Sequence, residues 1–70
     1  MNKYHSNIAS HKGEGWNGEP VYLFFARADY GNLGEQAARD RHAELCKRFP
    51  APDFKVTLHR ETRFWEEVDA

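Results

Sequence analysis

The alternation of hydrophobic and polar residues predicts two strands with one helix between them. Residues 21–29 (Val-Tyr-Leu-Phe-Phe-Ala-Arg-Ala-Asp) are rich in aromatic and apolar side chains and follow a proline, which is typical of a strand. Both faces of this segment are apolar, so we expect a central strand that is covered at least partly on each side. In residues 54–59, Phe54, Val56 and Leu58 alternate with polar neighbours, which predicts a strand with one buried and one solvated face.

The helix is predicted from its start signal, its stop signal and its apolar spacing. Asn32 is followed three residues later by Glu35, an arrangement typical of a capping box, so we expect the helix to begin at Leu33. It is expected to end at Phe49, because the two prolines that follow cannot continue it. At 100° per residue, one face of this helix is formed by Gly34, Ala38, His42, Leu45 and Phe49.

The N-terminal part of the chain is predicted to add a strand at the edge of the sheet. Within residues 3–9, Tyr4 and Ile8 fall on the same face, which favours an edge strand. Three glycines in residues 11–19 indicate a flexible hairpin loop between this strand and the next. This loop is not a phosphate-binding loop, because no Lys-Ser/Thr pair follows it and it does not open a helix.

The last ten residues are predicted to form a hairpin with the preceding strand. Residues 60–63 would make the turn, and the return strand would carry Phe64 or Trp65. A short C-terminal helix capped by Thr62 is the alternative.

Together these elements predict a small α+β domain. Strand, helix and strand in this order form a βαβ unit, in which the two strands run parallel and the crossover is right-handed. With the N-terminal strand added, we expect a two-layer ββαβ-type domain over residues 1–70, with one helix packed on a three- or four-stranded sheet. The second face of the sheet is then left without a helix and offers a surface to a partner.

Composition restricts the classes of protein to which the chain can belong. Its 70 residues support one small core, for which dimerisation or docking on a partner would be helpful. Ten Lys and Arg against eleven Asp and Glu exclude both a polybasic nucleic-acid tail and a polyacidic DNA mimic. The single cysteine, Cys46, excludes an intramolecular disulfide and a four-thiolate zinc site. With neither a membrane-spanning apolar run nor a secretory signal, we expect a cytoplasmic protein without membrane contact.

Histidine and cysteine residues provide two candidate chemical sites. His42 and Cys46 are spaced i,i+4 on the helix, as zinc ligands can be. The residues that would complete such a zinc site are His59 with His5 or His11. A semi-buried histidine beside an inert buried thiol is the favoured interpretation, so we expect no metal and no other cofactor. A thiol nucleophile with Asp40 is disfavoured, since Cys46 lies far from the positive end of the helix, and we expect no enzymatic activity.

Arginines on the helix and after the last strand suggest a second type of function. Next to Trp65 as a stacking surface, they would suit an RNA- or DNA-binding domain. Carboxylates are interleaved with them, so a solvated, ion-paired surface is the favoured interpretation and nucleic-acid binding the alternative. The candidate nucleic-acid-binding residues are Arg39, Arg41, Arg60 and Arg63.

Aromatic residues and local carboxylates suggest a surface that binds another protein. Trp16 lies in the glycine-rich loop, where it would either fold back as a lid on the small core or project as an anchor for a partner. The lid is slightly favoured on packing grounds. The candidate partner-binding residues are Glu14, Trp16, Glu19, Glu61, Trp65, Glu66 and Glu67.

In its size, its single domain, its strand-helix-strand plan and its lack of a catalytic motif, the chain resembles the small phage-encoded anti-CRISPR proteins. The resemblance implies an inhibitor that occupies a surface of a CRISPR–Cas effector complex and blocks target DNA recognition or nuclease recruitment. The near-zero net charge differs from that of the acidic, DNA-mimicking members. Local carboxylates would still suit a DNA-binding arginine patch, namely Glu14 with Glu19, and Glu61 with Glu66, Glu67 and Asp69. We therefore expect a protein partner, and a monomer or weak homodimer.

Overall fold

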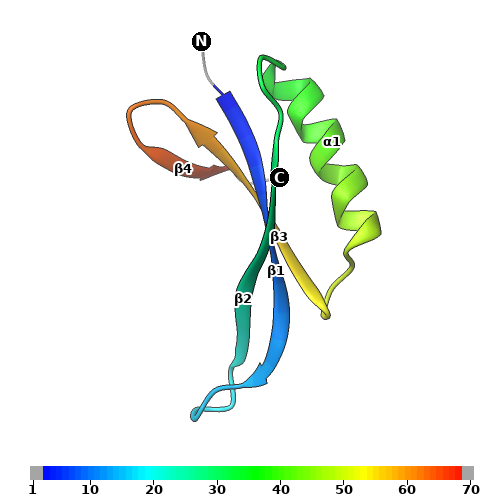
Figure 1. Cartoon of the computed structure of the whole chain (residues 1–70), viewed down its shortest axis with the longest axis vertical. Helices are drawn as coiled ribbons and strands as arrows, with labels where there is room; N and C mark the ends of the chain where they lie inside the picture. Colours follow the sequence, from blue (N-terminus) through cyan, green and yellow to red (C-terminus); the bar gives the residue numbers. More distant parts are fainter. Residues whose placement is uncertain (1–2, 69–70) are drawn as a thin grey trace.

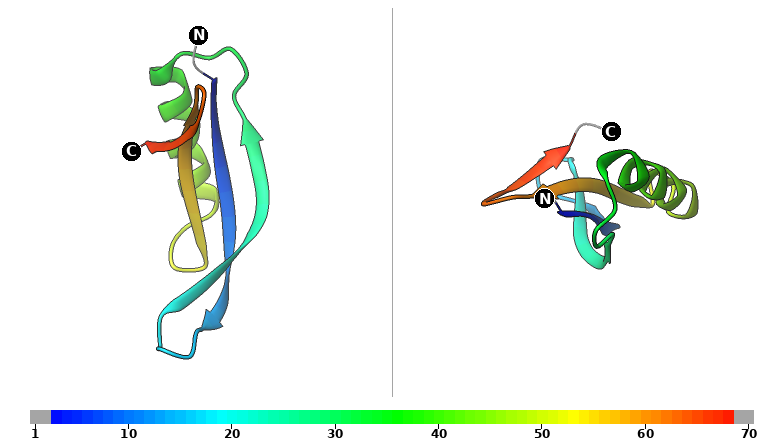
Figure 2. Two further views of the ribbon diagram at one scale, coloured as in Figure 1. Left: turned by 90° about the vertical axis from the view of Figure 1, so that its left-hand side faces the viewer. Right: turned by 90° about the horizontal axis from the view of Figure 1, so that it is seen from above.

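The computed structural model describes residues 3–68, which form one helix and one four-stranded sheet (Figure 1). The elements in chain order are β1 (Lys3–Glu14), β2 (Pro20–Asp29), α1 (Glu35–Arg48), β3 (Phe54–Glu61) and β4 (Trp65–Val68). The sheet has the order β2-β1-β3-β4, and all neighbouring strands are antiparallel. The helix lies on one side of the sheet (Figure 2), so the predicted two-layer α+β class is confirmed.

The places of the first two strands are the reverse of those predicted. β1 was expected at the edge, but it lies between β2 and β3, and its residues Tyr4 and Ile8 are buried. β2 was expected in the centre, but it is an edge strand, and Leu23, Phe24 and Phe25 are all more than half exposed. An apolar run marks a strand without saying which neighbour covers it. Here the short hairpin joins β2 to one side of β1, and the helix carries the chain to its other side.

The predicted βαβ unit is present, but another strand lies between its two strands. β2 and β3 are both antiparallel to β1, so they run parallel to each other as expected. They are not neighbours, however, because β1 occupies the position between them. Such an arrangement needs a partner strand that comes from outside the βαβ unit, and this chain supplies it from its N-terminus.

Two hairpins extend from the sheet. The β1–β2 connection covers residues 15–19, within the glycine-rich stretch 11–19, and Gly18 adopts φ +81°, a backbone region that favours glycine. This ribbon projects well beyond the end of α1 (Figure 1). The β3–β4 hairpin turns at 62–64 and confirms the predicted return strand, so the alternative of a C-terminal helix capped by Thr62 is not formed.

The core lies between α1 and the two middle strands of the sheet. The helix packs against β3 and β1, and Tyr30 packs against the edge of the core. On the predicted helix face, Ala38 and His42 are buried, whereas Gly34 is exposed. The buried apolar cluster consists of Tyr4, Ala38, Leu58 and Val68.

The helix begins two residues later than predicted and without the capping box. Its N-cap residue is Gly34, which makes no side-chain cap hydrogen bond, so Asn32 does not cap the helix. The Glu35 carboxylate does not reach back to the backbone. It accepts hydrogen bonds from the Tyr4 hydroxyl at 3.2 Å and from the Arg60 guanidinium at 2.9 Å, which ties the first turn of α1 to the sheet. Within residues 3–68, no helix has the length and apolar character needed to cross a membrane.

Replacing Ala38 with a larger residue tests the close packing of α1 on the sheet. Ala38 is completely buried, so Ala38→Leu is expected to lower the free energy of unfolding by about 1–3 kcal/mol, measured by urea denaturation. Ala43→Leu is the matched control on the exposed side of the same helix and is expected to change it by less than about 0.5 kcal/mol. Equal effects of the two substitutions would contradict this packing.

Candidate functional site

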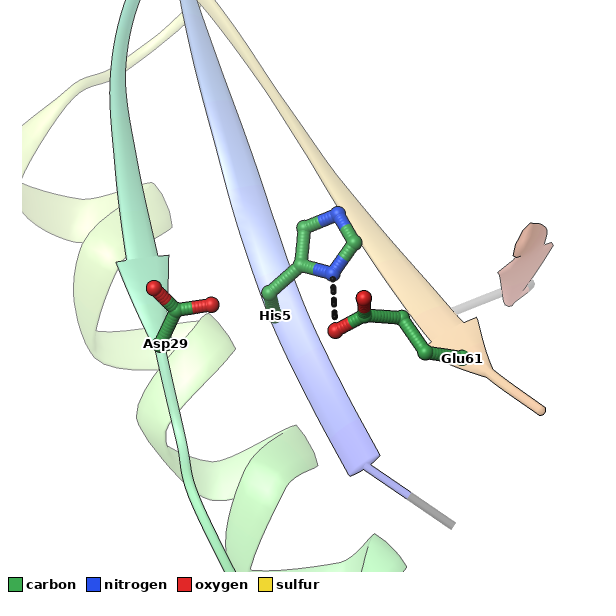
Figure 3. Close-up of side chains that lie close together, drawn as sticks. All are labelled: His5, Asp29 and Glu61. Carbon is green, nitrogen blue, oxygen red and sulfur yellow. Dashed lines mark hydrogen bonds and ion pairs between the residues drawn. The ribbon is translucent and has the colours of Figure 1, made fainter. Parts of the chain in front are cut away.

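The sheet face away from α1, which we call the open face, carries a cluster of histidine, carboxylate and aromatic side chains. Strand pairing sets His5 opposite both Asp29 on β2 and His59 on β3. Glu61 lies two residues beyond His59 and therefore points to the same face. Figure 3 shows that His5 and Asp29 lie close to Glu61, although they come from three different strands. The open-face cluster, as defined here, consists of His5, Arg27, Asp29, His59, Glu61 and Trp65.

His5 is completely buried although no helix covers this face. The His59 ring stacks on it with the ring centroids 5.0 Å apart, and the Trp65 ring meets its edge at 4.8 Å. Its Nδ1 lies 3.1 Å from a Glu61 carboxylate oxygen, which can accept a hydrogen bond from it. Its Nε2 is buried without a hydrogen-bond partner in the described part of the chain. Histidine and tryptophan rings thus take the place of a second layer over the middle of the sheet.

Arg27 neutralises the carboxylates of the open-face cluster. Its Nε donates to Asp29 at 2.8 Å, a second guanidinium nitrogen donates to Glu61 at 3.4 Å, and the guanidinium lies 5.1 Å from the Trp65 ring centroid. Ligand atoms of His5, Asp29 and Glu61 lie within 4.8 Å of one another, so these three side chains could hold a divalent cation. The guanidinium already supplies the positive charge there, and we interpret the cluster as a structural network.

A second polar network lies on the helix side of the sheet. The fully buried Ser6 hydroxyl lies 2.6 Å from the Tyr30 hydroxyl and 2.9 Å from His42 Nδ1. On the other side of the imidazole ring, Nε2 lies 3.5 Å from the Cys46 sulfur. Cys46 is exposed, so the expectation of a buried thiol is wrong. The network provides partners for the polar groups that the helix and β1 bury against each other.

Neither of the chemical sites predicted from His42 and Cys46 is assembled. These two residues face the helix side of β1, whereas His5 and His59 stack on the open face, so the sheet separates the proposed zinc ligands. Asp40 does not join His42 and Cys46 as a third member. It accepts a hydrogen bond at 3.1 Å from the amide of a glutamine one turn earlier in the helix.

Burial holds two of the histidines neutral near pH 7. Burial lowers the pKa of His42 below its ordinary value of 6.5, and the positive charge of Arg39 lowers it further. Burial also lowers the pKa of His59, and the adjacent His5 adds to this shift. Both imidazoles therefore resist protonation in the folded protein.

The predicted partner-binding residues fall into two separate groups. Trp16 is 99% exposed at the tip of the β1–β2 hairpin, so it does not form a lid on the core. With it at the tip are Glu14 and Glu19. The other group belongs to the β3–β4 hairpin, toward the opposite end of a molecule 41 Å long, and comprises Glu61, Trp65, Glu66 and Glu67. Asp69 lies outside the described residues.

The candidate nucleic-acid-binding arginines do not form a continuous basic surface. Arg60 donates to Glu35 at 2.9 Å and to Glu66 at 3.5 Å, and Arg39 lies 3.6 Å from the other oxygen of Glu35. Arg63 lies in the β3–β4 turn, away from the helix. The two arginines that the fold brings together, Arg39 and Arg60, are therefore already paired with carboxylates.

An open hollow of about 610 Å³ lies between the end of β2 and α1. It exists because the helix packs over β1 and β3 and leaves β2 uncovered. Positive and negative groups alternate around it, so its lining favours neither an anion nor a cation. These charged groups are Asp29, Asp40, Arg41, Glu44 and Arg48.

The exposed apolar side chains of β2 are a feature that the sequence pattern does not predict. Leu23 is 54% exposed and Phe24 is 69% exposed. Phe25 is 53% exposed even though its ring lies about 6 Å from the rings of Phe49 and Phe54. The apolar run indicates a strand, but by itself it favours burial inside the sheet over an exposed edge. Its position directly after a short hairpin was compatible with an edge strand as well.

Comparisons of the chain with protein-family models, with curated proteins and with solved structures found no match.

The contact between His5 and Glu61 can be tested by truncating the carboxylate. Glu61→Ala leaves the buried His5 Nδ1 without its acceptor, and we expect the free energy of unfolding to fall by about 1–3 kcal/mol in urea denaturation. Glu67→Ala removes an exposed carboxylate from the same hairpin and is expected to cost less than about 0.5 kcal/mol. A cost for Glu67→Ala as large as that for Glu61→Ala would show that Glu61 has no special role.

The depressed pKa values of His42 and His59 predict acid sensitivity. The unfolded chain binds more protons than the folded one below the ordinary value of 6.5, so the free energy of unfolding is expected to fall from about pH 7.5 to about pH 5.5. Urea denaturation at several pH values measures this slope.

Two variants locate the source of the acid sensitivity. His42→Asn keeps a polar atom near Ser6 but cannot titrate, so the slope is expected to become shallower. His59→Asn removes the second histidine with a lowered pKa and is expected to make the slope shallower as well. A steeper slope in His42→Asn than in the wild type would contradict the assignment.

Proposed function

We propose that the protein is a non-enzymatic protein-binding module that contacts its partner through the tip of the β1–β2 hairpin. The observation that carries this proposal is the position of Trp16, which is 99% exposed at the end of the projecting ribbon (Figure 1). A tryptophan in this position adds nothing to the core of its own chain. Tryptophan is, however, among the residues that contribute most to the affinity of protein interfaces.

The loop that carries Trp16 is held by its own hydrogen bonds. The Gly15 amide donates to the Glu19 carbonyl at 2.7 Å, and the Gly18 amide donates to the Gly15 carbonyl at 3.0 Å. The Asn17 side chain accepts from the Glu19 amide at 3.1 Å. An ordered loop loses less conformational entropy on binding than a flexible one, so this tip is suited to present an anchor residue.

The chemistry of the tip indicates the kind of partner surface. Trp16 requires an apolar pocket, and the exposed carboxylates of Glu14 and Glu19 favour basic residues around it. A DNA-binding subunit with an arginine-lined surface offers this combination. The resemblance to anti-CRISPR proteins makes a CRISPR–Cas effector complex the first partner to test, with loss of target DNA recognition as the consequence of binding.

Replacing Trp16 tests the proposal directly. Trp16→Ala is expected to weaken binding to the effector complex about 30-fold or more, as for a tryptophan anchor, while the far-UV CD spectrum stays unchanged. Binding is measured by capture of purified effector complexes on the tagged protein. Inhibition is measured by plaque formation of a targeted phage on bacteria that carry the matching CRISPR–Cas system.

Phe64→Ala is the matched control, because Phe64 is 75% exposed in the other hairpin. It is expected to bind and inhibit as the wild type does. Loss of binding in Phe64→Ala but not in Trp16→Ala would move the interface to the β3–β4 end. Binding that disappears after nuclease treatment would favour the nucleic-acid alternative, whose affinity would also fall steeply with salt.

A further inference from the structure

We propose that β2 pairs antiparallel with β2 of a second copy of this chain, so that two four-stranded sheets join into one continuous sheet. Within residues 3–68, β2 is hydrogen-bonded to β1 on one side only. The backbone groups on its other side form an unpaired edge of ten residues. This inference concerns a different surface from the hairpin tip and does not depend on the proposed function.

The two edges of the sheet differ in how well they are protected. β4 has only four residues, and two of them are the exposed carboxylates Glu66 and Glu67. A short, charged edge strand resists pairing with another chain. β2 is ten residues long and carries no charge between Pro20 and Ala26. β2 begins with a proline and its pairing with β1 shifts register at two places, features that also disturb an edge, but its first seven residues carry no charge. The edge of β2 is therefore less well protected than that of β4.

The large apolar side chains of β2 are exposed, although the protein buries few apolar side chains elsewhere. Among the described residues, five hydrophobic residues are buried, whereas seven large hydrophobic residues are exposed. Four of the seven lie on β2, and together they expose on the order of 400 Å² of apolar side chain. These four are Val21, Leu23, Phe24 and Phe25. Leu23 and Phe24 pair with successive residues of β1 and therefore point to opposite faces, so apolar side chains are exposed on both sides of this edge.

A second copy of the chain fits this edge because an antiparallel pair of identical strands is self-complementary. A two-fold axis near Leu23 would place Tyr22 opposite Phe24 of the other copy and Val21 opposite Phe25. Aromatic and β-branched side chains would then meet across the pair, and cross-strand pairs of this kind stabilise a sheet. The two-fold axis closes the assembly at two copies, since β4 offers no comparable edge.

The expected interface is small. The apolar side chains of two copies together with their backbone edges would remove roughly 1,000–1,200 Å² from water, which is at the lower limit for specific interfaces. We therefore expect a dimer that dissociates on dilution rather than an obligate one. In this register Trp16 lies outside the paired residues of β2, in the loop that falls opposite Tyr30 of the other copy.

Sedimentation equilibrium of the full chain over a range of concentrations tests the inference. The weight-average mass is expected to rise from 8.2 kDa toward twice that value and no further. Phe24→Lys places a charge in the paired strands and is expected to raise the dimer dissociation constant about 30-fold or more, with an unchanged far-UV CD spectrum because Phe24 is 69% exposed. Phe64→Lys is the matched control and is expected to dimerise as the wild type does.

A disulfide variant tests the position of the two-fold axis. In a Cys46→Ser background, Leu23→Cys is expected to form a disulfide-linked dimer under mild oxidation, whereas Phe64→Cys is not. Trp16→Ala is expected to leave the dimer intact, which separates this surface from the proposed partner site. A wild-type protein that stays monomeric up to about 1 mM, a mass above that of a dimer, or a Phe24→Lys variant that dimerises normally would overturn the inference.

Discussion

The structure depends on the position of β1 between β2 and β3. A pleated strand directs successive side chains to opposite faces, so a strand that is paired on both sides contributes to both layers of the fold. Tyr4, Ser6 and Ile8 point to the helix side, where they meet the core and the buried imidazole of His42. His5 points to the open face, where it lies under His59 and beside Glu61. A shift of β1 by one residue would exchange these two sets and place His5 in the apolar core.

The limited size of the helix explains why the surface is so rich in apolar groups. One helix of 14 residues packs on β1 and β3, and it leaves most of β2 uncovered apart from the contact of Phe25 with the Phe49 ring at its C-terminal end. On the open face, ring stacking and the ion pairs of Arg27 protect only the region around His5. The exposed large apolar side chains lie on β2 and near the two hairpin turns. The surfaces that we propose for dimerisation and for partner binding are therefore parts of the sheet and its hairpins that α1 does not cover.

The elements could be predicted because each has a local signal, whereas the sites could not. The alternation at residues 54–59 and the apolar spacing that buries Ala38 and His42 depend only on strand and helix periodicity. The capping box at Asn32 failed because the Glu35 carboxylate found stronger partners in Tyr4 and Arg60, which lie far away in the sequence. No local pattern contains such a competition between local and tertiary hydrogen bonds.

The class of the fold, the order of its elements and the tryptophan on a glycine-rich hairpin can be predicted from the residues alone, because periodicity and turn chemistry act over a few residues. The choice of the central strand depends on long-range packing, and it placed β2 at the edge and His5 under a ring stack. It also placed His42 and Cys46 on one side of the sheet and His5 and His59 on the other. The physical reason is that strand order and pairing register join residues far apart in the chain, and the free energy of that pairing depends on which faces a single helix can cover.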